Sequence, residues 1–179
     1  MTGKGHRLST FAFVLGTTSS PLAALFSFMG STFPDSSEYM FFGKRRNRYH
    51  RRYTHWFVIW LALSYICFSR ANWIVPRLSM LVDGRNAHYD VWSCAGFWFM
   101  GCLLHVLEDA FCGTVPLFRP WKRDAGIHIF HMSKKIGEMS RGEINFVFCC
   151  VGISFIAYLI RTFTVESFIA FLVSIWRSI

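Results

Sequence analysis

The stretch Gly101-Cys102-Leu103-Leu104-His105-Val106-Leu107-Glu108-Asp109 ends a long apolar run, and the rest of the chain is interpreted around it. His105 and Asp109 are four residues apart, so on a helix both side chains lie on one face, one turn apart. A histidine and a carboxylate in this position indicate either a metal site or a helix end whose polar residues reach water. The residues that gather around them decide between these two interpretations.

The composition is typical of a membrane protein. Of the 179 residues, 53% are apolar and only 16% are charged, against roughly 25% charged in soluble domains. The net charge of +9 is concentrated in connecting segments, which favours orientation in an anionic membrane over binding of nucleic acid. The six cysteines form no Cys-x-x-Cys pair, so we expect buried, reduced thiols. No compact apolar region with a cleavage site follows the basic start, so we expect no cleaved signal peptide.

Apolar blocks predict an all-α fold, a multi-span integral membrane helical bundle. They cover residues 8–33, 56–69, 89–107, 144–160 and 167–176. Thr17-Thr18-Ser19-Ser20-Pro21 interrupts the first block, because proline removes a backbone donor and disfavours helix at the preceding residue. This block forms either one span or two half-helices folded back as a re-entrant hairpin.

We expect a single membrane domain over residues 1–179. Residues 1–121 would form its motif-bearing core, residues 122–143 a cytoplasmic basic connection, and residues 144–179 two C-terminal spans. Within the core, residues 70–87 mix charges with short apolar pieces, which predicts a loop with an interfacial helix.

The order of the spans brings several polar residues to one face of the membrane. His50 and His55 precede the span over residues 56–69, and the following span returns to end at His105 on the same side. If the first block folds back at its break, His6 and Asp35 join them. The topology thus favours the metal-site interpretation.

Basic residues orient this face. Lysine and arginine number six in residues 44–52 and six in residues 119–141, against three in residues 70–85. The positive-inside rule therefore places the histidine side in the cytoplasm, with residues 44–48 anchoring the next helix.

Four histidines and two carboxylates at one face form a candidate site for Zn²⁺ or another divalent ion. These are His6, His50, His55, His105, Asp35 and Asp109. Six candidates exceed the four ligands of one closed zinc site, so the pattern also allows two ions, which favour phosphoester chemistry. Arg51 and Arg52 lie beside the histidines in sequence, and their guanidinium groups match an anionic substrate.

Five segments, spread in order over roughly residues 5–121, resemble the YdjM-type family of bacterial inner-membrane proteins, which are predicted metal-dependent hydrolases. The segments are Gly5-His6, Pro34-Asp35-Ser36-Ser37, His50-Arg51-Arg52-Tyr53-Thr54-His55-Trp56, Gly101 to Asp109, and Gly113 to Pro120. Two positions depart from the family pattern. Ser37 stands where the family has a second Asp, which either removes one ligand of a second metal or leaves Glu38 to substitute, and Trp56 stands where it has Ser.

The resemblance implies roles for individual residues. The implied ligands, or groups that orient ligands, are His6, Asp35, His55, His105 and Asp109. His50 and Arg51 would take part in catalysis by orienting ligands or binding phosphate. His128 and His131 match no family segment and are expected on the surface, and His88 is expected on the opposite side of the membrane.

Two functions are consistent with these observations. The first is a membrane-embedded, metal-dependent hydrolase of the bacterial inner membrane, with zinc as the expected ion and a lipid-linked or phosphoester substrate. The alternative is a structural or interaction component of an oligomer or membrane assembly, whose metal site is structural or degraded. A transporter is disfavoured, because no predicted span carries a charge near its centre.

Overall fold

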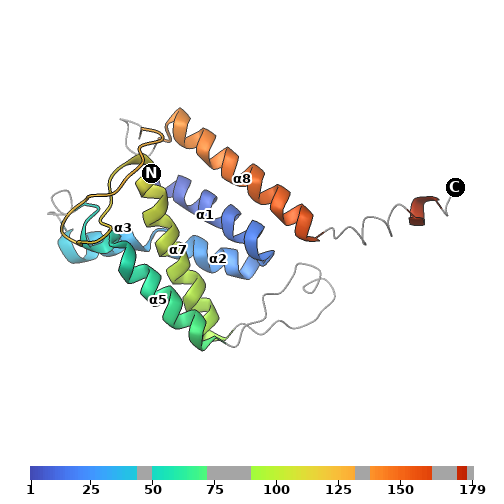
Figure 1. Cartoon of the computed structure of the whole chain (residues 1–179), viewed down its shortest axis with the longest axis horizontal. Coiled ribbons are helices and arrows are strands. Elements are labelled where there is room, and N and C mark those ends of the chain that lie inside the picture. The colour runs from blue at the N-terminus through green and yellow to red at the C-terminus, as the bar shows by residue number, and fades with distance from the viewer. Residues whose placement is uncertain (44–49, 72–89, 132–137, 163–172, 177–179) are drawn as a thin grey trace.

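The computed structural model describes residues 1–43, 50–71, 90–131, 138–162 and 173–176. Across these residues the chain is helical and contains no strand, only an isolated bridge between Val115 and Ala125. The elements are α1 (Gly3–Thr18), α2 (Pro21–Gly30), α3 (Phe33–Phe42), the 3₁₀ turn η2 (Tyr53–His55), α5 (Phe57–Arg70), α7 (Val91–Cys112) and α8 (Arg141–Thr162) (Figure 1). The prediction of an all-α fold is confirmed.

The first apolar block is a helical hairpin. Ser19 ends α1 in the left-handed region with φ 55°, and the side chain of Ser20 caps α2 by accepting a hydrogen bond from the Ala23 backbone. Pro21 then begins α2, where its missing N–H costs nothing. Val14 of α1 packs with Ala23 of α2, and the two helices lie side by side (Figure 1). Of the two arrangements left open by the sequence, the chain adopts the folded-back one.

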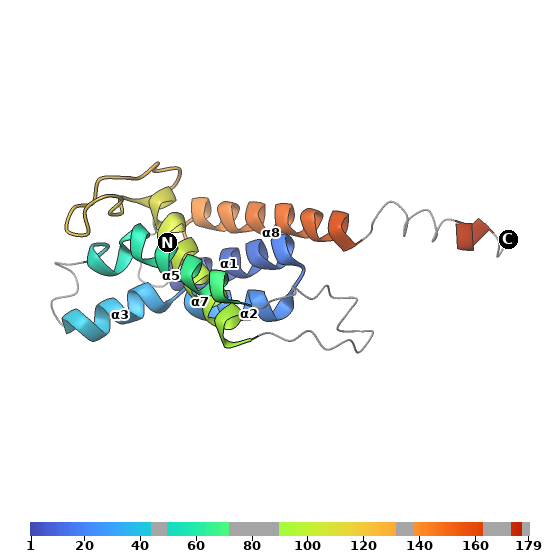
Figure 2. The same cartoon turned by 60° about the horizontal axis from the view of Figure 1, so that its bottom comes forward.

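Helix α7 is the central element and packs against α1, α2, α3 and α5 (Figure 2). This helix has 22 residues. Two segments are long and apolar enough to cross a membrane: α7 itself and residues Arg141–Ile160 of α8. Helix α5 is apolar but shorter, with 14 residues. These three helices occupy the predicted blocks at 56–69, 89–107 and 144–160.

Three predicted segments fall largely or wholly outside the described residues. They are the basic anchor at 44–48, the loop with an interfacial helix at 70–87 and the last span at 167–176. Residues 173–176 of that span are helical.

Small residues let α2 and α7 approach at backbone distance, as in many membrane helix pairs. A Cβ atom on Gly101 would collide with the Ser27 carbonyl, and one on Gly30 would collide with the Trp98 carbonyl. The Ser27 hydroxyl also donates to the Phe97 carbonyl over 2.8 Å. These contacts hold α2 against residues 97–101 of α7, one turn before His105.

Substituting Gly101 by alanine should therefore separate α2 from α7. We expect a loss of about 1–3 kcal/mol in the free energy of unfolding, the usual cost of overpacking, measured by denaturation in detergent micelles. Gly152→Ala on α8 is the matched control, because no atom lies within 4 Å of its added Cβ. Equal unfolding midpoints for the two variants would contradict the expectation.

Candidate metal centre

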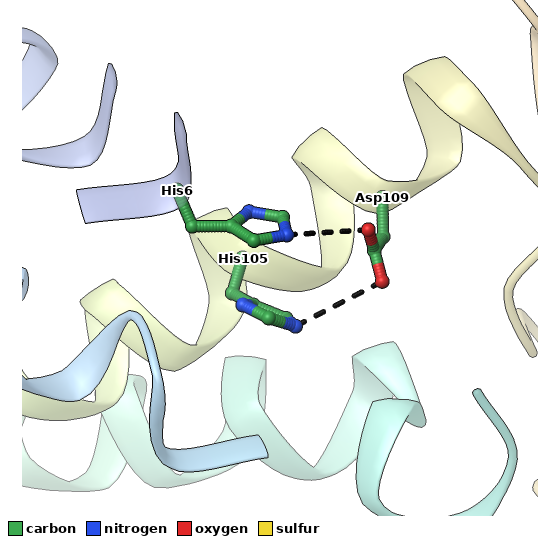
Figure 3. A group of neighbouring side chains, drawn as sticks. All are labelled: His6, His105 and Asp109. Atoms are coloured by element: carbon green, nitrogen blue, oxygen red, sulfur yellow. Dashed lines mark ion pairs between the residues drawn. The ribbon is translucent and has the colours of Figure 1, made fainter. Parts of the chain in front are cut away.

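Three histidines meet where the start of α1, the turn η2 and the C-terminal half of α7 come together. Figure 3 shows two of them, His6 and His105, together with Asp109. All three imidazoles, those of His6, His55 and His105, are fully buried, with 0% of each residue exposed. A buried polar ring needs partners for both nitrogens, so the neighbours of each nitrogen define its state.

In His105 and His6, Nδ1 faces a group that only accepts hydrogen bonds. His105 Nδ1 lies 2.6 Å from the Ser31 carbonyl oxygen, and His6 Nδ1 lies 2.6 Å from Glu108 Oε2. Both Nδ1 atoms must therefore donate, which leaves Nε2 of each neutral ring with a lone pair. Metal-binding histidines are oriented in this way.

His55 is oriented similarly from η2. Its Nδ1 lies 3.1 Å from Thr54 Oγ1 and 3.6 Å from Glu38 Oε1. Its Nε2 faces His105 Nε2 at 3.1 Å. If both neutral rings carry their proton on Nδ1, two lone pairs meet at this distance, and a cation between them removes the repulsion.

The two oxygens of Asp109 contact different histidines. Oδ1 lies 3.2 Å from His6 Nε2, although the hydrogen-bond direction is poor. Oδ2 lies 3.5 Å from His55 Nε2 and 3.8 Å from His105 Nε2. Asp35 adds a further carboxylate, with Oδ1 3.6 Å from His55 Nε2. One carboxylate thus faces all three imidazoles, and a second carboxylate faces His55.

These separations match the spacing of ligands around one ion. Zinc bonds of about 2.0–2.1 Å place tetrahedral ligands about 3.3 Å apart. The four distances that join Nε2 of His55 and His105 to each other and to the carboxylates run from 3.1 to 3.8 Å. His6, His105 and Asp109 form a second overlapping set, with ligand atoms within 4.8 Å of one another. The donor set of imidazoles and carboxylates suits a divalent transition metal.

The electrostatics also favour a cation here. Burial opposes a charged His6, but the carboxylates of Asp109 and Glu108 outweigh it and raise the pKa of His6 to about 9. Burial likewise opposes an ionised Asp35, yet the hydrogen bond with His55 and the charge of His105 hold the pKa of Asp35 below its usual value. Positive charge, whether a proton or a metal ion, is stabilised between these groups, and an ion at His6 would displace a proton.

Glu108 orients the His6 ring through its Nδ1 atom. Its Oε1 accepts hydrogen bonds from Ser9 Oγ at 2.7 Å and Thr10 Oγ1 at 3.1 Å, while Oε2 holds His6. The carboxylate thereby joins the first turns of α1 to α7. It orients the His6 ring and keeps Nε2 directed at Asp109 Oδ1.

Replacing Glu108 by alanine should weaken metal binding about 10- to 100-fold, as loss of a group that orients a ligand typically does. Competition with a chromogenic chelator measures the affinity. Glu108→Gln keeps an acceptor for His6 Nδ1, and we expect it to retain most of the affinity. If the glutamine and alanine variants lose affinity equally, hydrogen bonding to His6 is not what Glu108 contributes.

The structure brings together all five predicted ligands: His6, Asp35, His55, His105 and Asp109. His50 and Arg51 lie next to them in different settings. His50 Nδ1 contacts Glu38 Oε2 at 2.7 Å, and Arg51 Nη2 donates to Asp109 Oδ1 at 2.7 Å. Arg51 is only 6% exposed, so its guanidinium holds a carboxylate and does not project into solvent.

The remaining histidines that the structure describes are not part of this centre. His128 and His131 lie exposed on the surface, as expected, and His88 lies outside the described residues. Sequence reasoning missed Glu108, although an acid beside Asp109 in an apolar helix was a signal for it. It also missed the Ser31 carbonyl, for which no side chain gives a signal.

Fold and centre together define an all-α membrane protein with a buried cluster of histidines and carboxylates. A family model described as YdjM inner membrane protein matches residues 1–173, and the chain belongs to this family. No curated protein and no solved structure matches the chain. The family identified from the five sequence segments is confirmed, and so is the inner-membrane class.

Proposed function

We propose that this chain is a membrane-embedded, metal-dependent hydrolase. Its divalent ion would be held by Asp35, His55, His105 and Asp109, with His6 on the second oxygen of Asp109. The observation that carries the proposal is the convergence of three imidazole Nε2 atoms and two carboxylates, with each Nδ1 held by a separate partner. Such a donor set with oriented rings is what metal-binding proteins provide.

A bound ion of this kind would lower the pKa of a water ligand to about 7 and stabilise negative charge on an attacked phosphoryl or carbonyl oxygen. The chain's own residues orient and shield the centre. Ser31 and Glu108 fix the His105 and His6 rings, and Arg51 donates to Oδ1 of Asp109, the oxygen that faces His6. Zinc is the first ion to test, because mixed nitrogen and oxygen ligands at these separations suit it.

The surroundings support a substrate that arrives from the bilayer. Helix α5 begins two residues after His55 and exposes Val58, Ile59 and Leu61 in its first turns, so an apolar surface begins beside the centre. We propose a lipid-linked or phosphoester substrate, a multi-pass arrangement, and a centre that faces the cytoplasm. The orientation rests on the lysines and arginines in residues 44–52 and 119–141.

The test uses the full chain purified in detergent. Metal analysis should find a stoichiometric transition metal. Hydrolysis of chromogenic phosphoesters and of a phosphate-bearing lipid in mixed micelles should stop on chelation and resume on addition of Zn²⁺. Absence of any stoichiometric metal in protein with intact His55 and His105 would overturn the proposal.

A second candidate function is a structural component of a membrane assembly. One observation favours it: His6, His55, His105 and Asp109 are all buried, and structural zinc sites are closed to water. In that case metal would bind without hydrolysis. Loss of a ligand would then lower the amount of folded protein or its assembly, not a reaction rate.

A further inference from the structure

We propose that Asp35, Glu38 and His50 form a second cation site beside the first, so that the centre holds two divalent ions bridged by Asp35. The proposal rests on the first site, because the two sites share Asp35. The second ion would be the one exposed to substrate, which narrows the substrate class to phosphoesters, the typical substrates of paired ions about 3.5–4 Å apart.

The three side chains come from α3 and from the turn before η2. Asp35 and Glu38 are three residues apart on α3, which puts them on one face of the helix. Each of the three residues offers a ligand atom, and these atoms lie within 4.8 Å of one another. Two carboxylates and an imidazole suit zinc, manganese or iron(II).

Glu38 is held so that one oxygen faces His50. Its Oε1 accepts from the Arg51 backbone N–H at 2.9 Å and contacts Thr54 Oγ1 at 3.4 Å. Its Oε2 lies 2.7 Å from His50 Nδ1. Glu38 is fully buried, with 0% exposed, and a buried carboxylate is costly unless a cation or hydrogen bonds compensate it. Hydrogen bonds already compensate this carboxylate, and an ion on Oε2 would replace the hydrogen bond with His50.

The second site is the accessible one. The side chains of His50 and Asp35 are 34% and 30% exposed, whereas those of His55 and Glu38 are 0% exposed. Water and an anionic ester can therefore reach an ion at His50 without entering the buried cluster. Asp35 belongs to both sets of ligands, so its two oxygens can serve one ion each.

Glu38 takes the place of the acidic residue that the family pattern has at position 37, where this chain has Ser37. The Ser37 hydroxyl donates to the Pro34 carbonyl at 2.9 Å within α3, and the residue is 2% exposed. The neighbouring Glu38 instead directs its carboxylate to His50 and His55. Of the two consequences left open for Ser37, the geometry points to replacement of the missing acid by Glu38.

Manganese binding to the full chain in detergent tests the proposal. The wild type should bind two Mn²⁺ per chain and give the electron paramagnetic resonance spectrum of a spin-coupled pair. His50→Ala should halve the bound Mn²⁺ and give the spectrum of an isolated ion, and His50→Gln should do the same while keeping a polar side chain. His128→Ala, at an exposed histidine, should bind two.

The outcomes separate the second site from the first. One ion in the wild type, lost in His105→Ala and unchanged in His50→Ala, would overturn the second site and leave the first. Two coupled ions in both His50 variants would also overturn the assignment of His50. No bound Mn²⁺ in the wild type would overturn this inference, and failure to bind Zn²⁺ as well would also overturn the proposed function.

Discussion

Replacing His105 by alanine is expected to abolish metal binding at the buried cluster, leaving at most the ion proposed at Asp35, Glu38 and His50. His105 belongs to both ligand sets of the buried cluster, with His6 and Asp109 and with Asp35 and His55. Its Nε2 lies 3.1 Å from His55 Nε2, and its Nδ1 is fixed by the Ser31 carbonyl. Loss of a group that merely orients a ligand costs 10- to 100-fold in affinity, so loss of this ligand should cost more than about 100-fold.

Metal content after dialysis, together with chelator competition, measures this effect. His128→Ala is the matched control, because that histidine is exposed and belongs to none of the ligand sets. The imidazole ring of His6 stacks on that of His105, with ring centroids 3.8 Å apart. His105→Gln keeps a polar side chain of similar length, so it separates loss of metal from loss of packing against His6. A His105→Ala protein that keeps its metal at wild-type affinity would contradict the assignment.

The helices were predictable because apolar blocks carry a strong local signal. Blocks at 56–69, 89–107 and 144–160 correspond to α5, α7 and α8. The break before Pro21 was visible as well, but its consequence was not. Whether α2 folds back depends on contacts with α7, where Gly101 and Gly30 permit close approach, and such contacts are between residues far apart in sequence.

The candidate ligands were predictable because topology and the family segments agree on the same face. The groups that orient these ligands were not predictable. Glu38 and Ser31 act on His55 and His105 only because three helices converge. Glu143 is a further case: it is the last residue of the predicted connection over residues 122–143, and its Oε1 accepts from the Thr2 backbone at 2.7 Å. It thereby ties the start of α8 to the start of α1, one turn before His6.

Substituting Asp109 by alanine should give the largest loss of stability. Its Oδ1 accepts from Arg51 Nη2 at 2.7 Å, and both residues are buried, at 2% and 6% exposed. Removing one partner of a buried ion pair leaves the other charge without its counterion, which typically costs about 3–5 kcal/mol. Measurements on metal-free protein exclude the separate effect of losing a ligand. The free energy of unfolding in detergent micelles is the quantity to compare.

The double variant Arg51→Met/Asp109→Leu tests the cause. Asp109 Oδ1 also pairs with the buried N-terminal ammonium of Met1, so removing Asp109 and Arg51 together leaves one unpaired cation instead of two. If the cost arises from the unpaired cations, the double variant should recover part of the lost stability, because buried pairs replaced by apolar residues are often neutral. Met also keeps a long side chain beside Gly113, where the guanidinium packs so closely that a Cβ atom would collide with it. Equal destabilisation in the single and double variants would mean that the loss does not arise from the charge of Asp109 on Arg51.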